Sequence, residues 1–157
     1  MIDERGETVE TGVKPLRLHW DEDTCTGCLS CTVVCSERHT GQSAPSRARI
    51  RIIVDLLTAE HSAGYCRQCR NAPCASACPE EAIRFDPHLR AWMVDDARCN
   101  GCGVCVGACP FQAIWRDPRA NVAIKCDLCL GATRCIEICP ANALSLRGRD
   151  KEAGDGR

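Results

Sequence analysis

Sixteen cysteines are the residues of this 157-residue sequence best suited to chemistry, and they fall into four groups of four. The groups are Cys25, Cys28, Cys31 and Cys35; Cys66, Cys69, Cys74 and Cys78; Cys99, Cys102, Cys105 and Cys109; and Cys126, Cys129, Cys135 and Cys139. The first and third groups read C-x2-C-x2-C-x3-C, whereas the middle gap widens in the second and fourth groups. Thiols so close together pair as disulfides, bind zinc or bind iron–sulfur clusters.

The spacing favours iron–sulfur clusters over the other two kinds of site. Two-residue spacers strain a disulfide, and zinc sites use CxxC pairs separated by a longer knuckle. Three thiolates in this register each bind one iron of a 4Fe-4S cluster, and the fourth Cys, typically followed by Pro, ligates a neighbouring cluster. Cys78, Cys109 and Cys139 carry that proline, whereas Cys35 is followed by Ser36. We therefore predict four 4Fe-4S clusters, with zinc and disulfides as the alternatives.

The remaining composition excludes several classes of protein. The 20 Lys and Arg residues nearly balance 21 Asp and Glu residues, which argues against a nucleic-acid partner. No run of about 18 apolar residues is present, so we expect no direct membrane insertion. The first residues, Met1 to Glu7, lack the apolar stretch of a secretory signal, which favours a cytoplasmic location. Motifs for nucleotide binding or nucleophilic catalysis are missing, so we predict no catalytic site in this chain.

A repeat extends beyond the cysteines and indicates the elements that position them. The phrase Pro-x-x-Ala, followed by Ile or Leu, begins at Pro79, Pro110 and Pro140, which predicts one structural unit used several times. We expect one or two helical turns around the last two cysteines of each group and a short strand after the alanine. Residues 82–85 and 92–94 flank a Pro-containing turn and predict a hairpin, and residues 122–124 predict a similar strand.

Charged residues near the cysteines suggest electrostatic roles. In the insertion at residues 36–65, Arg47, Arg49 and Arg51 alternate with apolar residues, which predicts a strand with the arginines on one face. This face is either solvated, or a basic strip that docks an acidic partner or offsets cluster charge.

Three further charged residues lie beside or among the cysteines. We expect Arg98 and Lys125, which precede Cys99 and Cys126, to raise the reduction potential of the adjacent cluster. We expect Glu137 to lower it, and the four histidines to lie at the surface. The alternative is that these charged side chains simply point into solvent.

From Leu16 to Leu146 the sequence resembles the four-cluster iron–sulfur subunits of molybdopterin oxidoreductases, whose relatives serve tungsten aldehyde oxidoreductases, carbon monoxide dehydrogenases and hydrogenases. The similarity lies in the second motif, from Cys66 to Cys74, in the start of the fourth, from Lys125 to Cys129, and in the segment from Pro45 to Ile50. Larger members have long insertions and a membrane-contacting C-terminal extension that this chain lacks, which implies the compact, soluble branch.

The resemblance implies how the cysteines share the clusters. Cluster one would take Cys25, Cys28, Cys31 and Cys139; cluster two Cys126, Cys129, Cys135 and Cys35; cluster three Cys66, Cys69, Cys74 and Cys109; and cluster four Cys99, Cys102, Cys105 and Cys78. Some members replace one ligand and hold a three-iron cluster, but here all sixteen thiols are present.

The implied fold is α+β, with two ferredoxin-like dicluster modules built from short hairpins and short helices, one nested inside the other in sequence. We predict an outer module at residues 16–65 and 117–146, an inner module at residues 66–116, a flexible N-terminus at residues 1–15 and a flexible C-terminal tail at residues 147–157.

The implied function is electron transfer through the clusters, as the iron–sulfur subunit of a multi-subunit oxidoreductase. The expected partners are a catalytic subunit, such as a tungsten or molybdenum pterin aldehyde oxidoreductase or a carbon monoxide dehydrogenase, and a flavin subunit or a ferredoxin. A free-standing polyferredoxin that shuttles electrons between enzymes is the alternative, and a zinc-bound interaction module is a third. Clusters near both ends also leave end-to-end self-association open.

Overall fold

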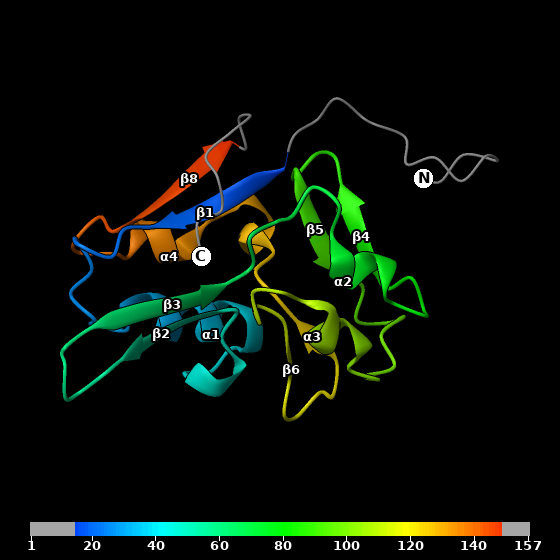
Figure 1. Ribbon diagram of the computed structural model, residues 1–157, viewed down its shortest axis with the longest axis horizontal. Coiled ribbons are helices and arrows are strands. Elements are labelled where there is room, and N and C mark those ends of the chain that lie inside the picture. The colour runs from blue at the N-terminus through cyan, green and yellow to red at the C-terminus, as the bar shows by residue number, and fades with distance from the viewer. Residues whose placement is uncertain (1–14, 149–157) are drawn as a thin grey trace.

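The computed structural model describes residues 15–148 and shows short helices around four two-stranded antiparallel ribbons (Figure 1). The strands are β1 Leu16–Trp20, β2 Ile50–Val54, β3 His61–Tyr65, β4 Ile83–Asp86, β5 Ala91–Val94, β6 Trp115–Arg116, β7 Ala123–Ile124 and β8 Leu144–Gly148. The helices are α1 Ser30–Thr40, α2 Pro73–Ser76, α3 Val104–Ala108 and α4 Arg134–Glu137, with 3-10 turns η1 Pro45–Arg47 and η2 Leu128–Gly131. The predicted α+β class is confirmed, as is the hairpin formed by β4 and β5.

Strands from the two ends of the described chain lie side by side. β1 pairs with β8, with Leu16 opposite Gly148 and Trp20 opposite Leu144, so the segments assigned to the outer module meet. The β6–β7 ribbon pairs residues 115–116 with residues 123–124 and therefore crosses the expected boundary between the modules. β8 runs two residues into the expected C-terminal tail. The rest of the two expected flexible ends, residues 1–14 and 149–157, lies outside the described residues.

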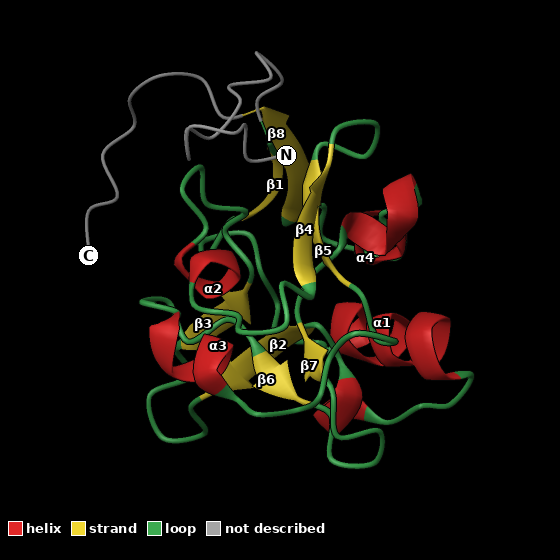
Figure 2. Cartoon of the chain, turned by 90° about the vertical axis from the view of Figure 1, so that its right-hand side faces the viewer, coloured by secondary structure: helices red, strands yellow, loops and turns green. Residues whose placement is uncertain are grey.

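Proline sets the length of the cysteine-bearing helices. α2, α3 and α4 are four or five residues long, and each ends shortly before a Cys-Pro pair. α1 has eleven residues, because Ser36 rather than proline follows Cys35, and it ends at Thr40, where Gly41 caps it with φ 69°. The hydroxyl of Ser36 is buried, donates to the Val33 carbonyl and accepts from the Ala44 amide, which holds the start of the insertion against this helix. The loop that follows α1 turns back beneath the helix (Figure 2).

The strand predicted at residues 47–52 is correct only in its second half. The chain forms the 3-10 turn η1 over Pro45–Arg47, and β2 begins at Ile50. Ile50 and Ile52 are buried and face the core, as expected from the alternating pattern. The strand prediction from the arginine pattern was wrong at the first residues because proline at the start of η1 favours a helical turn over an extended strand.

The three arginines of this segment form neither a solvated face nor a docking strip. Arg47 pairs with Asp117, Arg49 pairs with Asp127, and the Arg51 guanidinium lies 4.1 Å from the centroid of the Trp115 ring. The Arg47 and Arg49 side chains are only 16% and 19% exposed. These contacts tie the insertion to the chain around the third and fourth cysteine groups.

The core consists of three small buried clusters, and each of them contains cysteines. One gathers Leu18, Ile50, Tyr65 and Leu144 around Cys31, Cys35 and Cys135. A second joins Cys66 and Cys126 with Ala91 and Leu128, and a third packs Ile83 and Ile114 around Cys105. The sparse apolar side chains therefore enclose the thiols instead of forming a separate core. In the part of the chain that is described, no helix has the length and apolar character needed to cross a membrane.

Candidate metal centres

Three hollows in the structure are each lined by four cysteines. The first contains Cys78, Cys99, Cys102 and Cys105; the second Cys35, Cys126, Cys129 and Cys135; and the third Cys66, Cys69, Cys74 and Cys109. Each hollow combines three cysteines of one sequence group with one cysteine of another. These are the same residues that the sequence analysis assigned to clusters four, two and three, and the hollows are named hollow four, hollow two and hollow three accordingly.

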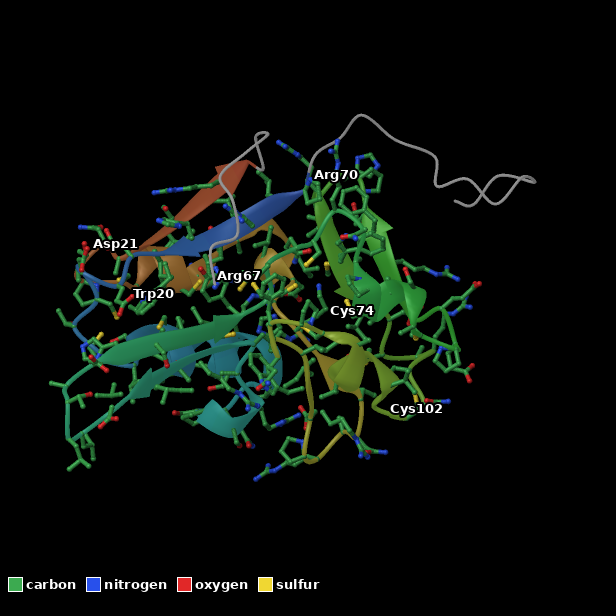
Figure 3. The ribbon with its side chains drawn as sticks, in the orientation of Figure 1. Trp20, Asp21, Arg67, Arg70, Cys74 and Cys102 are labelled. Carbon is green, nitrogen blue, oxygen red and sulfur yellow. The ribbon has the colours of Figure 1, made fainter. Side chains whose placement is uncertain are left out.

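The remaining four cysteines lie around the start of α1 and the end of α4. Cys31 is close enough to Cys25 and Cys139 for their charges to raise its pKa, after the larger effect of burial. Cys28 is exposed, as is Cys102 in hollow four, whereas the other fourteen cysteines are buried or half-buried. Cys102 lies at the edge of the molecule and Cys74 lies further inside (Figure 3).

A backbone amide donates to the sulfur of the last cysteine in every group. The amides of Ala82, Ala113 and Ala143 each lie 3.3 Å from the Sγ of the cysteine four residues earlier. The repeated proline ends the helix at this point and turns the chain back, so that the alanine amide faces the sulfur. Cys35 lacks this proline, and its Sγ accepts from the amide of Arg49 in the insertion, at 3.2 Å. The repeat was visible in the sequence, but the donor role of its alanine was not.

The loops that carry the cysteines have left-handed backbone at fixed places. Leu29, Gly103 and Thr133 precede α1, α3 and α4, and all three have positive φ angles in the left-handed helical region. Cys129 and Leu130 also have φ angles of 52° and 56°. A non-glycine residue in this region costs about 1–2 kcal/mol. Such strain concentrates at functional sites, where bound groups and packing hold it in place.

Burial makes several of the thiols poor acids. It raises the pKa of Cys31 and Cys74 to about 11 and that of Cys135 to about 12, and it raises the pKa of Cys126 well above the usual value. A thiolate is stable in such a place only when a cation compensates its charge. Iron ions would supply that charge, and sulfur is their preferred ligand in clusters. The donor set therefore fits iron–sulfur clusters.

Asp127 organises the polar wall of hollow two. Its carboxylate accepts from the Arg49 guanidinium, from the Cys129 amide at 2.9 Å and from His39 Nε2 at 3.1 Å. The other ring nitrogen of His39 donates to the Cys35 carbonyl at 2.8 Å. Burial alone would lower the pKa of His39, but the hydrogen bond to Asp127 raises it to about 9.

The Asp127 network corrects one sequence-based expectation. His39 was expected at the surface, yet its side chain is only 11% exposed. Ligand atoms of His39, Asp127 and Cys129 lie within 4.8 Å of one another, but His39 and Asp127 are bonded to each other. Sequence reasoning missed this network because its members are up to 88 residues apart.

Lys125 differs from the other charged residues near the cysteines because it is buried. Its side chain is 2% exposed, and its Nζ donates to the carbonyl oxygens of Trp92 and Cys126. It lines hollow three, although the neighbouring Cys126 lines hollow two. The side chain of Lys125 therefore faces the thiols of hollow three, which its place next to Cys126 in the sequence did not indicate, and its effect on a reduction potential stays a prediction.

The two other charged residues that were singled out lie at the surface. The Arg98 guanidinium donates to the Glu80 carbonyl, and Arg134 pairs with Glu137 at 2.7 Å, with both side chains more than half exposed. Charges that are solvated in this way act weakly on a cluster. The Arg98 and Glu137 side chains therefore lie in solvent, which was the alternative interpretation of the sequence.

Sulfur-lined hollows on short hairpins and helices define the class of this molecule, which is an iron–sulfur electron-transfer protein. The chain belongs to the 4Fe-4S dicluster domain family, whose pattern it matches over residues 57–149. The predicted cofactor class and the predicted electron-transfer function are confirmed.

Named relatives agree with this assignment. The polyferredoxin-like subunit of aliphatic sulfonate oxidoreductase from Pyrococcus furiosus is 38% identical over 117 residues, which cover 74% of this chain and 67% of that protein. The thiosulfate reductase electron transfer subunit PhsB from Salmonella typhi is 33% identical, over 83% of this chain and 74% of that one. A putative electron transport protein of Escherichia coli, YsaA, is 37% identical over 83% of this chain and 88% of its own.

A solved structure supports the fold alone. The active-site complex BamBC of benzoyl coenzyme A reductase contains a chain that matches with a TM-score of 0.51. The match covers 89% of this chain and 81% of that chain at 24% sequence identity. The arrangement of the short helices and strands therefore recurs in a known structure.

Proposed function

We propose that the chain is the electron-transfer subunit of a multi-subunit oxidoreductase and holds four 4Fe-4S clusters in a line. Each cluster would accept one electron and pass it to the next. The protein itself fixes the order of the clusters, excludes water from them and sets the charge around them. The observation that carries this proposal is that the only two exposed cysteines of the described chain, Cys28 and Cys102, belong to the two terminal sites.

The proposed ligand sets rest on which cysteines share a hollow. Hollows two, three and four each supply four sulfurs, and the cysteines at the start of α1 and the end of α4 supply the fourth set. Sixteen thiols match four clusters with four ligands each. In every set one ligand comes from a different cysteine group, so each cluster would cross-link two segments of the chain.

Contacts between neighbouring sets support the order one, two, three, four. Cys31 of the first set is near enough to Cys135 of the second for its charge to act on that thiol. Cys66 and Cys126, of sets three and two, pack in the same buried cluster. Cysteines of both set three and set four pack around the Ile83 and Ile114 pair: Cys74, Cys109, Cys78, Cys99 and Cys105. Each junction contains buried residues of the described chain, which suits a path for single electrons.

The two ends of this line lie at opposite ends of the molecule. The segment that leads into α1 lies at the end that also carries the tip of the β2–β3 hairpin, and Cys102 lies at the other end (Figures 1 and 3). A molecule with two exposed cluster edges can receive electrons from one partner and deliver them to another. This arrangement suits a subunit between two redox partners.

The relatives support a catalytic partner subunit. The relative from Pyrococcus furiosus is a subunit of an aliphatic sulfonate oxidoreductase, and PhsB serves a thiosulfate reductase. By analogy, we propose a catalytic subunit that donates electrons to this chain or takes them from it. The identity of both partners stays a prediction: a tungsten or molybdenum aldehyde oxidoreductase or a carbon monoxide dehydrogenase as the catalytic partner, and a flavin subunit or a ferredoxin as the second partner. Self-association and a cytoplasmic location also stay predictions.

Anaerobic purification of the untagged protein from its native source tests the proposal. We expect about sixteen irons and sixteen acid-labile sulfides per chain, EPR signals after reduction, and elution well above the 17.1 kDa of the chain during size-exclusion chromatography. Elution at the size of the chain would instead indicate a free carrier. Zinc in place of iron would overturn the electron-transfer function.

A further inference from the structure

Lys125 is a buried cation for which the described chain offers no anionic side chain. It is the largest of the fully buried side chains, with 2% exposure. Its Nζ donates to two carbonyl oxygens, and within residues 15–148 no carboxylate pairs with it. Removing an ammonium group from water costs several kcal/mol unless a negative charge compensates it. Two carbonyl dipoles supply only part of that compensation.

The side chain lies where thiolates gather. Lys125 lines hollow three together with Cys66, Cys69, Cys74 and Cys109. Burial raises the pKa of the Cys74 thiol to about 11, and the charge of Lys125 opposes this increase. The ammonium group is therefore close enough to act on the sulfurs of this set.

The cations beside the other hollows are compensated or solvated. Arg49 and His39 at hollow two share the carboxylate of Asp127. Hollow four is lined by Arg116 and Glu80, which are both exposed and opposite in charge. Among the three hollows, hollow three is thus the one lined by a buried cation, Lys125, that has no carboxylate partner in the described chain.

We propose that Lys125 is the fixed counter-ion of cluster three and makes that cluster easier to reduce than clusters two and four. This inference rests on the proposed function, because it requires a cluster bound by the hollow-three thiolates. A 4Fe-4S cluster with four thiolates carries a charge of about −2 when oxidised and about −3 when reduced. A nearby buried cation stabilises the reduced form more than the oxidised form, because little water screens it. The electron comes from the partner redox subunit.

The protein holds this charge in place. Trp92 and Cys126 anchor Nζ from two sides, and the buried side chain cannot swing into solvent. Gln68, which is fully buried, fixes the same two residues by accepting from the Trp92 amide at 2.7 Å and donating to the Cys126 carbonyl at 2.8 Å. The positive charge is therefore preorganised, and its effect on the cluster needs no rearrangement when the electron arrives.

EPR-monitored redox titration of the cluster-loaded Lys125→Met protein tests the proposal. Methionine keeps an unbranched side chain and removes the charge. We expect the midpoint potential of the cluster in hollow three to fall by at least about 59 mV, which corresponds to a tenfold weaker equilibrium for one-electron reduction. The other three midpoint potentials should move far less. A Cys74→Ser variant identifies the signal, because it alters the spectrum of the cluster bound in hollow three. Arg84→Met, which removes an exposed cation of the same half of the chain, is the matched control and leaves all midpoints unchanged.

Two further measurements separate the possible failures. If Lys125→Met loads poorly, Lys125→Gln retains an amide donor without the charge, and the same lowered midpoint is expected. If Lys125→Met or Lys125→Gln has its full iron content and unchanged midpoint potentials, Lys125 is not the counter-ion of cluster three. Its role would then be structural, through its hydrogen bonds. Absence of iron–sulfur signals in the unmodified protein would instead overturn the proposed function.

Discussion

Gln68 and Cys126 are joined by a hydrogen bond of 2.8 Å from the Gln68 Nε2 to the Cys126 carbonyl oxygen, although they are 58 residues apart in sequence. The Gln68 Oε1 accepts from the amide of Trp92 in β5 at 2.7 Å. One buried amide side chain thus connects the second cysteine group, the inner hairpin and the fourth cysteine group. It holds together the place where hollows two and three adjoin.

Replacing Gln68 with leucine should loosen this junction. The change leaves the Trp92 amide without its acceptor, which costs about 1–3 kcal/mol, whereas the Cys126 carbonyl keeps the hydrogen bond from Lys125. We expect the variant to lose its visible absorbance in urea about 5 to 30 times faster than the unmodified protein, since 1–2 kcal/mol corresponds to such a factor. Stopped-flow or manual absorbance measurements under anaerobic conditions give this rate.

Gln42→Leu is the matched control for the Gln68 variant. Gln42 is exposed, and its Oε1 accepts only a long hydrogen bond of 3.3 Å from Arg119. Its replacement should change the rate of cluster loss by less than twofold, because surface substitutions rarely exceed 0.5 kcal/mol. Equal rates for the two leucine variants would contradict the importance of the Gln68 junction.

Gly101 should be essential for the integrity of hollow four. It has φ +73° and precedes Cys102, and a Cβ atom there would lie 2.0 Å from the Asn121 carbonyl oxygen. Backbone must move to relieve such an overlap, so Gly101→Ala should displace the loop that carries Cys102. We expect the purified variant to contain about a quarter less iron, since one of four proposed clusters is lost. Iron analysis with a chelator and EPR after reduction measure this loss.

Gly107→Ala provides the comparison in the same segment. Gly107 lies in α3 between Cys105 and Cys109, and a Cβ atom there meets nothing within 4 Å. Alanine in a helix is favoured over glycine by about 0.5–1 kcal/mol, so this variant should keep its full iron content and lose it no faster. Iron loss from both glycine variants would mean that the clash at Gly101 is not the cause.

The ion pair of Arg47 and Asp117 should give the protein a pH-dependent contribution to stability. Burial alone would raise the pKa of Asp117, but hydrogen bonds from the Ala120 and Arg119 amides and from Arg47 lower it below the ordinary value of 3.8. The folded protein therefore binds this proton less readily than the unfolded chain does. The stabilisation is complete above about pH 5 and is lost as the pH falls through the lowered pKa of the folded state.

Asp117→Asn isolates this contribution. We expect the variant to unfold faster than the unmodified protein in urea at pH 7, by a factor that stays constant down to about pH 5 and shrinks toward one below pH 4. Far-ultraviolet circular dichroism follows unfolding, and acid damage to the clusters cancels in the ratio of the two rates. A ratio that grows on acidification would contradict the lowered pKa of Asp117.

The sequence was most informative where chemistry imposes regular spacing. The cysteine intervals and the repeat that follows them were enough to predict the cluster type and the short helices, and the apolar residues on both sides of a Pro-containing turn predicted the β4–β5 hairpin. These features are local, because a few residues of chain determine whether three sulfurs face one point and where a helix ends.

Long-range electrostatics could not be predicted in this way. Lys125 precedes Cys126 in the chain but faces hollow three, and Arg47 and Arg49 reach Asp117 and Asp127 across 70 and 78 residues. Such pairings depend on how distant segments pack against one another, and the spacing of residues in the sequence does not predict this packing. The arginine alternation at residues 47–52 was also misread, because a 3-10 turn replaces the first part of the expected strand.

Cys135 and Cys139 offer a direct test of the proposed ligand sets, because they are close in sequence but assigned to different clusters. Cys135 lies within α4 and lines hollow two together with Cys129 and Cys35, whereas Cys139 follows the helix, does not line that hollow and lies near Cys31. A serine at a ligand position weakens one iron–sulfur bond and alters the EPR signal of that cluster. We expect Cys139→Ser to change the same signal as Cys28→Ser, and Cys135→Ser to change the same signal as Cys35→Ser. If Cys135→Ser and Cys139→Ser alter one common signal, the fourth group binds a single cluster and the exchange of ligands between groups is wrong.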